Sequence, residues 1–60
     1  MTTSKHPSPK AIKKARSDAG LTQSQAAAVI GYSLRSWQEW EGGRRNMRLV
    51  TFSAFMRLSK

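Results

Sequence analysis

Residues 21–43 constrain the fold more than any other part of the chain, because they hold two short helical patterns separated by one glycine. Thr22 opens the first pattern with a capping box, and Ser33 stands where the second helix is expected to begin. Gly31 lies between them, and glycine readily takes the left-handed conformation that ends a helix. The stretch therefore predicts two helices joined by a tight turn, at residues 23–30 and 34–41.

The predicted helix 34–41 has two chemically different sides. Its large apolar residues, Trp37 and Trp40, share one side with Glu41 at spacings of three and four. Both indoles are expected to lie in the core, although stacking on a base or sugar is the alternative for Trp37. The other side carries three polar residues, Arg35, Gln38 and Glu39. We therefore expect one side to pack inward and the other to touch a polar partner.

A further helix is expected before this pair and another after it. The first runs from Pro9 or Lys10 to Ala19, with Ser8 as its cap and Gly20 after its end. The last begins near residues 46–48 and runs to about Leu58, with Leu49, Phe52, Phe55 and Met56 in one apolar stripe. Val50, Ala54 and Leu58 widen its apolar surface beyond what a thin core needs. Part of this helix, about 47–58, is therefore expected to face a second subunit.

No strand pattern is present, so the fold class is all-α. Residues 1–9 contain two prolines, Lys5 and His6, and no apolar run, which predicts a disordered basic arm over residues 1–8. The arm either reaches along a nucleic-acid backbone or is a terminus without function. Residues 9–60 form the one expected domain.

The formal net charge of +8 over 60 residues indicates a polyanionic partner. A basic surface that only aids solubility is the alternative. The excess of lysine and arginine lies before residue 21 and after residue 43, whereas the central stretch is close to neutral. This distribution favours flanking cations that hold phosphates and a central helix that reads bases.

Several classes of function are not expected. The chain has no cysteine and one histidine, His6, so neither a disulfide nor a metal site is predicted. No membrane span or secretory signal is seen, and the lysines and arginines do not gather on one face of a long membrane-active helix. No nucleophile–base pair is visible, so we expect no enzyme activity, no cofactor and no small-molecule ligand. A cytoplasmic location in a bacterial or phage-infected cell, with the protein bound to the nucleoid, fits this pattern.

The motif Leu21-Thr22-Gln23, then Ala27, Ile30-Gly31, Ser33, Trp37, Trp40-Glu41 and Gly43, resembles the Cro/C1 (Xre-type) helix-turn-helix regulators. The resemblance covers about residues 10–58. It implies a compact lambda-repressor-like DNA-binding domain of four to five helices. The segment 35–41, with Arg44, Arg45 and Met47 behind it, resembles a subset found in phage and mobile-element regulators. Some anti-CRISPR-associated repressors belong to that subset.

The resemblance also implies roles for single residues. Expected base contacts are Leu34, Arg35, Gln38 and Glu39, and expected phosphate contacts are Gln23, Ser33, Arg44 and Arg45. The chemistry agrees, because arginine pairs with guanine, glutamine with adenine, and glutamate accepts from cytosine. Alternatives remain: Arg35 and Glu39 as a mutual surface pair, and Gln23 as an ordinary helix-start residue. Leu34 departs from the polar residue common in the family, and it either contacts a thymine methyl or packs.

Arg16 and Glu41 are each an ion on an otherwise apolar helix face. A buried charge needs a partner, and the family resemblance places a pair at these two positions. We therefore expect an ion pair between the first and third helices.

Taken together, these features predict a sequence-specific double-stranded DNA-binding repressor that acts as a homodimer on an inverted repeat. Helix 34–41 would enter the major groove, and repression would follow from promoter occlusion. The alternative is a protein-interaction module, such as an antitoxin-like partner, that keeps the fold without reading DNA.

Overall fold

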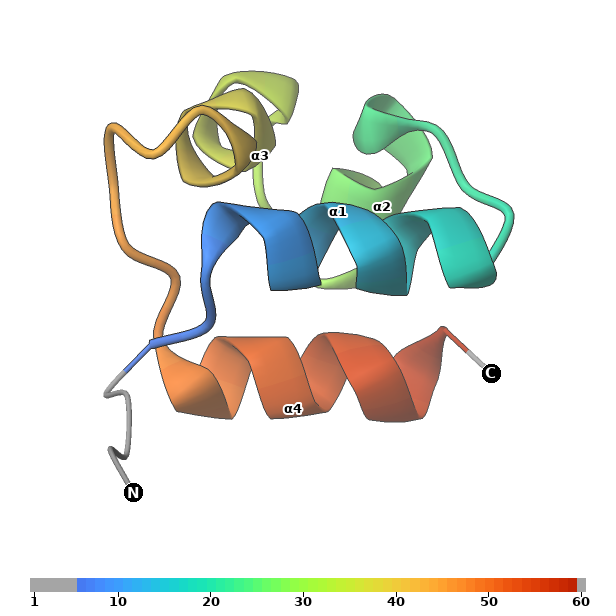
Figure 1. Cartoon of the computed structure of the whole chain (residues 1–60). Coiled ribbons are helices and arrows are strands. Elements are labelled where there is room, and N and C mark those ends of the chain that lie inside the picture. Colours follow the sequence, from blue (N-terminus) through green and yellow to red (C-terminus); the bar gives the residue numbers. More distant parts are fainter. Residues whose placement is uncertain (1–5, 60) are drawn as a thin grey trace.

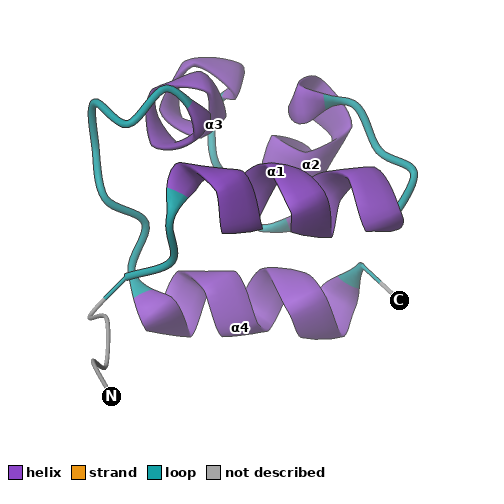
Figure 2. Cartoon of the chain, in the orientation of Figure 1, coloured by secondary structure: helices purple, strands orange, loops and turns teal. Residues whose placement is uncertain are grey.

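The computed structural model describes residues 6–59 and folds them into four α-helices. The helices are α1 (Pro9–Asp18), α2 (Gln23–Val29), α3 (Leu34–Glu41) and α4 (Leu49–Leu58). No strand occurs in this part of the chain, and Figure 2 shows only helices and connecting loops. The prediction of an all-α domain is confirmed.

The first three helices begin at the predicted polar caps. The Ser8 hydroxyl accepts a hydrogen bond from the Ala11 amide, and the Ser33 hydroxyl accepts one from the Ser36 amide. Thr22 makes both bonds of its capping box. Gly31 provides the turn between α2 and α3. Its φ is +74°, a backbone conformation in which a residue with a side chain would be strained.

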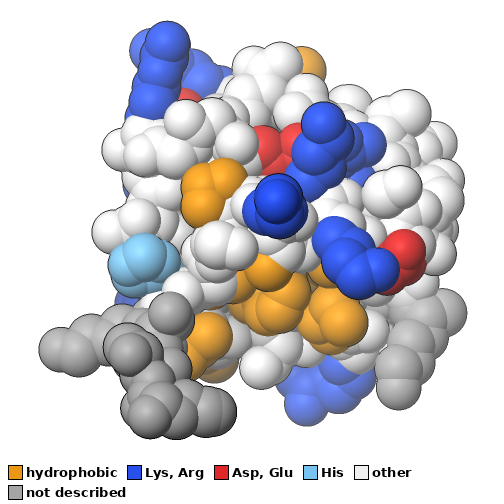
Figure 3. Space-filling model, in the orientation of Figure 1, with side chains coloured by type: hydrophobic (Ala, Val, Ile, Leu, Met, Phe, Trp, Pro, Cys, Tyr) orange, Lys and Arg blue, Asp and Glu red, His pale blue; other side chains and the backbone are white. Residues whose placement is uncertain are grey.

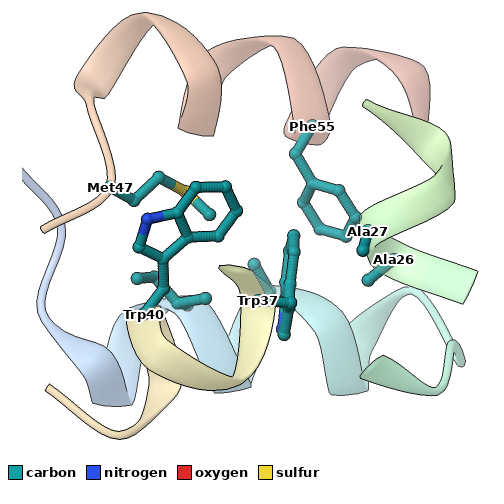
Figure 4. Close-up of a cluster of buried hydrophobic side chains, with 8 residues drawn as sticks. Ala26, Ala27, Trp37, Trp40, Met47 and Phe55 are labelled. Atoms are coloured by element: carbon teal, nitrogen blue, oxygen red, sulfur yellow. The ribbon is translucent and has the colours of Figure 1, made fainter. Parts of the chain in front are cut away.

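The helices enclose one small core. In Figure 1, α2 and α3 lie in the upper part of the view and α4 runs along the bottom, with α1 drawn across the middle. The helix α2 contacts both α3 and α4. The largest fully buried side chains come from α1, α3, α4 and the loop before α4: Ile12, Trp37, Phe55 and Met47. The helix α2 adds the small buried residues Ala26 and Ala27. Figure 4 shows Trp37 beside Phe55, and their ring centroids are 4.9 Å apart. The prediction that Trp37 and Trp40 form the centre of the core agrees with their exposed fractions of 0% and 4%.

The fourth helix differs from its prediction in two ways. It begins at Leu49, so Met47 fills the core from the preceding loop instead of from a helix. Its predicted apolar stripe is also split, because Phe55 is buried and Phe52 half-buried, whereas Leu49 and Met56 are each 45% exposed. Only a narrow side of α4 meets the core, so the rest of its apolar surface faces outward.

The described residues before α1 run along the body of the domain. His6 and Pro7 are half-buried, and His6 lines a shallow hollow with residues 46–50. Residues 1–5, including Lys5 of the predicted arm, lie outside the described residues. Over residues 6–59, no helix has the length and hydrophobicity needed to cross a membrane.

Candidate nucleic-acid interface

The orientation of α3 is set by its inward side. Trp37 and Trp40 pack edge to face, with ring centroids 5.7 Å apart, and Tyr32 covers Trp40 at 4.9 Å. The two buried rings leave α3 little freedom to rotate about its axis. Leu34 and Arg35, before the two tryptophans, and Gln38 and Glu39, between them, are consequently held on the outer side of the helix.

Glu41 ties α3 to both earlier helices. Arg16 donates to it twice, from Nε to Oε2 at 2.6 Å and from Nη2 to Oε1 at 3.2 Å. Gln23 Nε2 donates to Oε1 at 3.1 Å, and the Trp37 indole N–H donates to Oε2. Each carboxylate oxygen therefore accepts two hydrogen bonds. The structure thus brings together Arg16 and Glu41, the two residues for which the sequence predicts a pair, and adds two donors to them.

Arg16 and Glu41 each favour the charged form of the other. Burial of Glu41 disfavours its ionised form, but hydrogen bonds from Arg16, Trp37 and Gln23, with the charge of Arg16, outweigh burial and lower the pKa of Glu41. The hydrogen bond to Glu41 raises the pKa of Arg16. Arg16 also donates from Nη1 to the Leu21 carbonyl at 3.1 Å, so it braces the loop that leads into α2. The cluster holds α1, α2 and α3 in one arrangement.

The outward side of α3 forms a shallow hollow. The four residues predicted to contact bases line it: Leu34, Arg35, Gln38 and Glu39. Ser33, Gly42 and Arg44 complete the lining. Arg35 has 87% of its side chain exposed, and Leu34 is 42% exposed. Polar and apolar groups that can contact base edges therefore share one accessible surface.

Glu39 is the least free member of this hollow. Only 22% of its side chain is exposed, and its carboxylate lies between two arginines. Arg45 Nη1 is 3.3 Å from Oε1, and Arg35 Nε is 3.7 Å from Oε2. The predicted alternative of an Arg35–Glu39 surface pair therefore describes the free protein, with Arg45 as a third member.

The residues predicted to touch phosphates differ in how many hydrogen bonds they already make within the domain. Arg44 is exposed at the rim of the hollow, and the exposed Arg45 donates to Glu39. The Ser33 hydroxyl is used in capping α3 and in a bond to the Ser36 hydroxyl. Gln23 donates one amide N–H to Glu41, and this hydrogen bond joins α2 to α3.

Sequence reasoning missed several contributors. Trp37 and Gln23 are donors to Glu41, and the spacing of four between Trp37 and Glu41 was a signal for the first of these. Met47 had no helical period to mark it as a core residue. The role of Arg45 as a partner of Glu39 depends on the path of the loop, which no local pattern predicts.

The surrounding surface is strongly basic. On the face drawn in Figure 3, lysine and arginine side chains appear above, across and below the domain, while acidic side chains show in few places. One of the lysines, Lys14 on α1, pairs with Asp18 at 3.2 Å. Within residues 6–59, no group of three metal-ligating side chains comes together. The side chains that line the hollow, among them Arg35, Gln38 and Arg44, offer charge and hydrogen-bonding groups to a partner.

Two comparisons with known proteins agree with this geometry. The family model described as "Helix-turn-helix domain" matches residues 11–60. A type II methyltransferase, M.MspI of Moraxella sp, is 40% identical over 45 residues, which cover 75% of this chain. The chain spans 11% of the length of that methyltransferase, so the similarity concerns one small segment of it.

Proposed function

The chain belongs to the helix-turn-helix domain family, a DNA-binding fold, and from this premise we propose that it is a sequence-specific repressor of transcription. In this proposal α3 enters the major groove of double-stranded DNA. Bound protein then blocks a promoter by occlusion. We further propose that it is a regulator of the Cro/C1 type, in the phage and mobile-element subset that includes anti-CRISPR-associated repressors, because its sequence motif resembles theirs.

The observation that carries the proposal is the division of α3 into a locked side and an open side. Trp37 and Trp40 are buried, and the side chains of Arg35 and Gln38 point away from them into the open hollow. Arg35 can donate two bonds to guanine, and Gln38 can pair with adenine. Leu34, half-exposed beside them, can contact a thymine methyl group.

Backbone contacts are proposed on either side of the reading residues. Arg44 lies at the rim of the hollow, and Arg45 follows it with 58% of its side chain exposed. Gln23 keeps one amide N–H for a phosphate, and Ser33 lies at the start of α3. Such contacts set the position of the protein on DNA and do not distinguish sequences by themselves.

A homodimer is proposed through the outer face of α4. Outside the core, α4 exposes four large apolar side chains, Leu49, Val50, Met56 and Leu58, and the helix contains no acidic residue. In Figure 1, α4 lies across the domain from α3, so contact between two copies of α4 would leave both α3 helices available. The domain measures 32 × 24 × 17 Å, a size compatible with two recognition helices about 34 Å apart on an inverted repeat.

The proposal assigns binding and no catalysis to the chain. Methyl transfer is not carried over from the type II methyltransferase, because the matched segment is 11% of that protein. A protein that reads promoters works on the nucleoid, and we propose that location in a bacterial or phage-infected cell.

Selection of bound duplexes from a random pool tests the proposal. We expect an inverted repeat with half-sites about one helical turn apart. Arg35→Ala and Gln38→Ala should each remove the preference at one base pair in each half-site, by about 1–3 kcal/mol per contact. Arg44→Gln should weaken binding to all sequences and reduce the salt dependence.

Lys14→Gln is the matched control, since it removes one positive charge from α1, where the side chain already pairs with Asp18. If no sequence is enriched and the salt dependence of binding is shallow, the repressor proposal fails. The alternative, a protein-interaction module of the antitoxin-like kind, would then be favoured, with the exposed face of α4 as its contact surface.

A further inference from the structure

Glu39 lies on the proposed reading surface, yet its surroundings do not suit a residue that reads bases. Its carboxylate is mostly covered, with 22% of the side chain exposed, whereas Arg35 beside it is 87% exposed. One of its oxygens, Oε1, already accepts a hydrogen bond from Arg45 Nη1 at 3.3 Å, so fewer acceptor positions are left for a cytosine. Contact with a base would also bring its negative charge towards a polyanion.

The same residue organises the loop that follows α3. The Glu39 backbone carbonyl accepts hydrogen bonds from the amides of Arg44 and Arg45, at 2.9 Å and 3.3 Å. Its carboxylate then holds the side chain of Arg45. Main chain and side chain of a single residue therefore fix the start of the loop that carries two proposed phosphate contacts.

The contact with Arg35 leaves the working end of that side chain free. Glu39 Oε2 lies 3.7 Å from Arg35 Nε, so the pair restrains the guanidinium from its inner edge. The two terminal nitrogens of Arg35 remain available for a forked contact with guanine. An arginine that is partly ordered before binding loses less conformational freedom when it meets its base.

From these contacts we infer that Glu39 is a positioning residue, which couples base reading by Arg35 to phosphate binding by Arg45. This inference rests on the proposed function, and it reduces the reading residues to Leu34, Arg35 and Gln38. In this inference Glu39 accepts no bond from cytosine, which differs from the expectation drawn from the sequence.

The test compares Glu39→Gln with the wild-type protein on the selected duplex and on its single-base variants. The base pair read by Arg35 is first located with Arg35→Ala. If Glu39 positions Arg35, Glu39→Gln should lower discrimination at that same base pair by about tenfold. In an Arg45→Gln background the additional effect of Glu39→Gln should shrink to less than about twofold, because the network is already broken. Glu39→Asp, which retains the charge, should recover part of the discrimination.

Asp18→Asn is the control for net charge, because it removes one negative charge from an exposed pair on α1. A uniform gain in affinity for Glu39→Gln, equal to that of Asp18→Asn, would overturn the inference. Loss of preference at a different base pair, with no coupling to Arg45, would also overturn it and restore Glu39 as a base reader. Failure of the wild-type protein to select any sequence would instead refute the proposed function, so the two failures are distinguishable. Circular dichroism melting of each variant verifies that it is folded.

Discussion

Glu39 and Glu41 lie two residues apart on the same helix, and the structure uses them in opposite ways. Glu41 faces inward, where Arg16, Gln23 and Trp37 saturate both of its oxygens. Glu39 faces outward between Arg35 and Arg45, both of which are well exposed to solvent. The first carboxylate joins three helices, and the second organises a surface loop.

The difference shows that a carboxylate's contribution to stability depends on whether its donors could form hydrogen bonds to water in its absence. Around Glu41 the donors are buried or half-buried, so water can replace the carboxylate only in part. Around Glu39 the arginines can turn to solvent at little cost. The inner glutamate is therefore expected to govern stability, and the outer glutamate to govern binding.

The largest expected effect is that of Glu41→Gln. Because each oxygen accepts two donors, an amide NH₂ in either position would face two N–H groups and leave them unpaired. We expect a loss of about 3 kcal/mol in the free energy of unfolding, as for breaking a buried ion pair. That is a large part of the roughly 3–9 kcal/mol available to a domain of this size.

Urea unfolding followed by tryptophan fluorescence measures this change. Arg16→Met should be destabilising as well, because it leaves the Glu41 carboxylate without its cation. An unchanged melting temperature in either variant would show that the pair does not hold the helices together.

An intermediate effect is expected on acidification. The pKa of Glu41 is lowered in the folded chain from its ordinary value of 4.5, so the unfolded chain takes up this proton at a higher pH. The stability that ionised Glu41 provides is complete above about pH 5 and is lost as the pH falls through the lowered pKa. The loss should be smaller than in Glu41→Gln, since a protonated carboxyl group still accepts some of its bonds.

Thermal unfolding between pH 7 and pH 3 gives the measurement. The double variant Arg16→Met with Glu41→Leu is the control, because apolar replacement of a whole buried pair is often tolerated. Its melting temperature should fall less with acid than that of the wild-type protein. Equal acid sensitivity in both would assign the effect to the other carboxylates.

The smallest expected effect on stability is that of Glu39→Gln. Exposed ion pairs contribute about 0–1 kcal/mol, so the free energy of unfolding should change by less than about 0.5 kcal/mol. The same urea titration used for Glu41→Gln measures it, which makes the two variants a matched pair on one helix. A loss as large as that of Glu41→Gln would remove the contrast between the two sides of α3.

Much of the contact pattern on the inner side of α3 could be predicted from the sequence, but less of that on its outer side. The pairing of Arg16 with Glu41 was expected because each is an ion on an apolar face, and a buried ion needs a partner. The involvement of Gln23 depends on how α2 packs beside α3, which no spacing within one helix reveals. The covered state of Glu39 depends on a loop that returns Arg45 to the helix.

The last helix illustrates the same limit. Its apolar residues were recognisable, but the burial of Phe55 and the exposure of Leu49 and Met56 depend on which side of α4 meets the core. Met47 could not be identified as a core residue, because it lies in a loop with no periodic pattern. The half-site spacing of the selected duplexes tests the proposal that a second copy covers the exposed side.

The sequence by itself determined the four helices, the caps of the first three, the turn at Gly31 and the two-sided character of α3. Caps, turns and periodicity act over three or four residues, so neighbouring residues suffice to specify them. Only the tertiary structure decided which donors meet Glu41, that Met47 enters the core, and that Glu39 lies between two arginines. These contacts join side chains from different helices and loops, and their distances exist only after the elements have packed together.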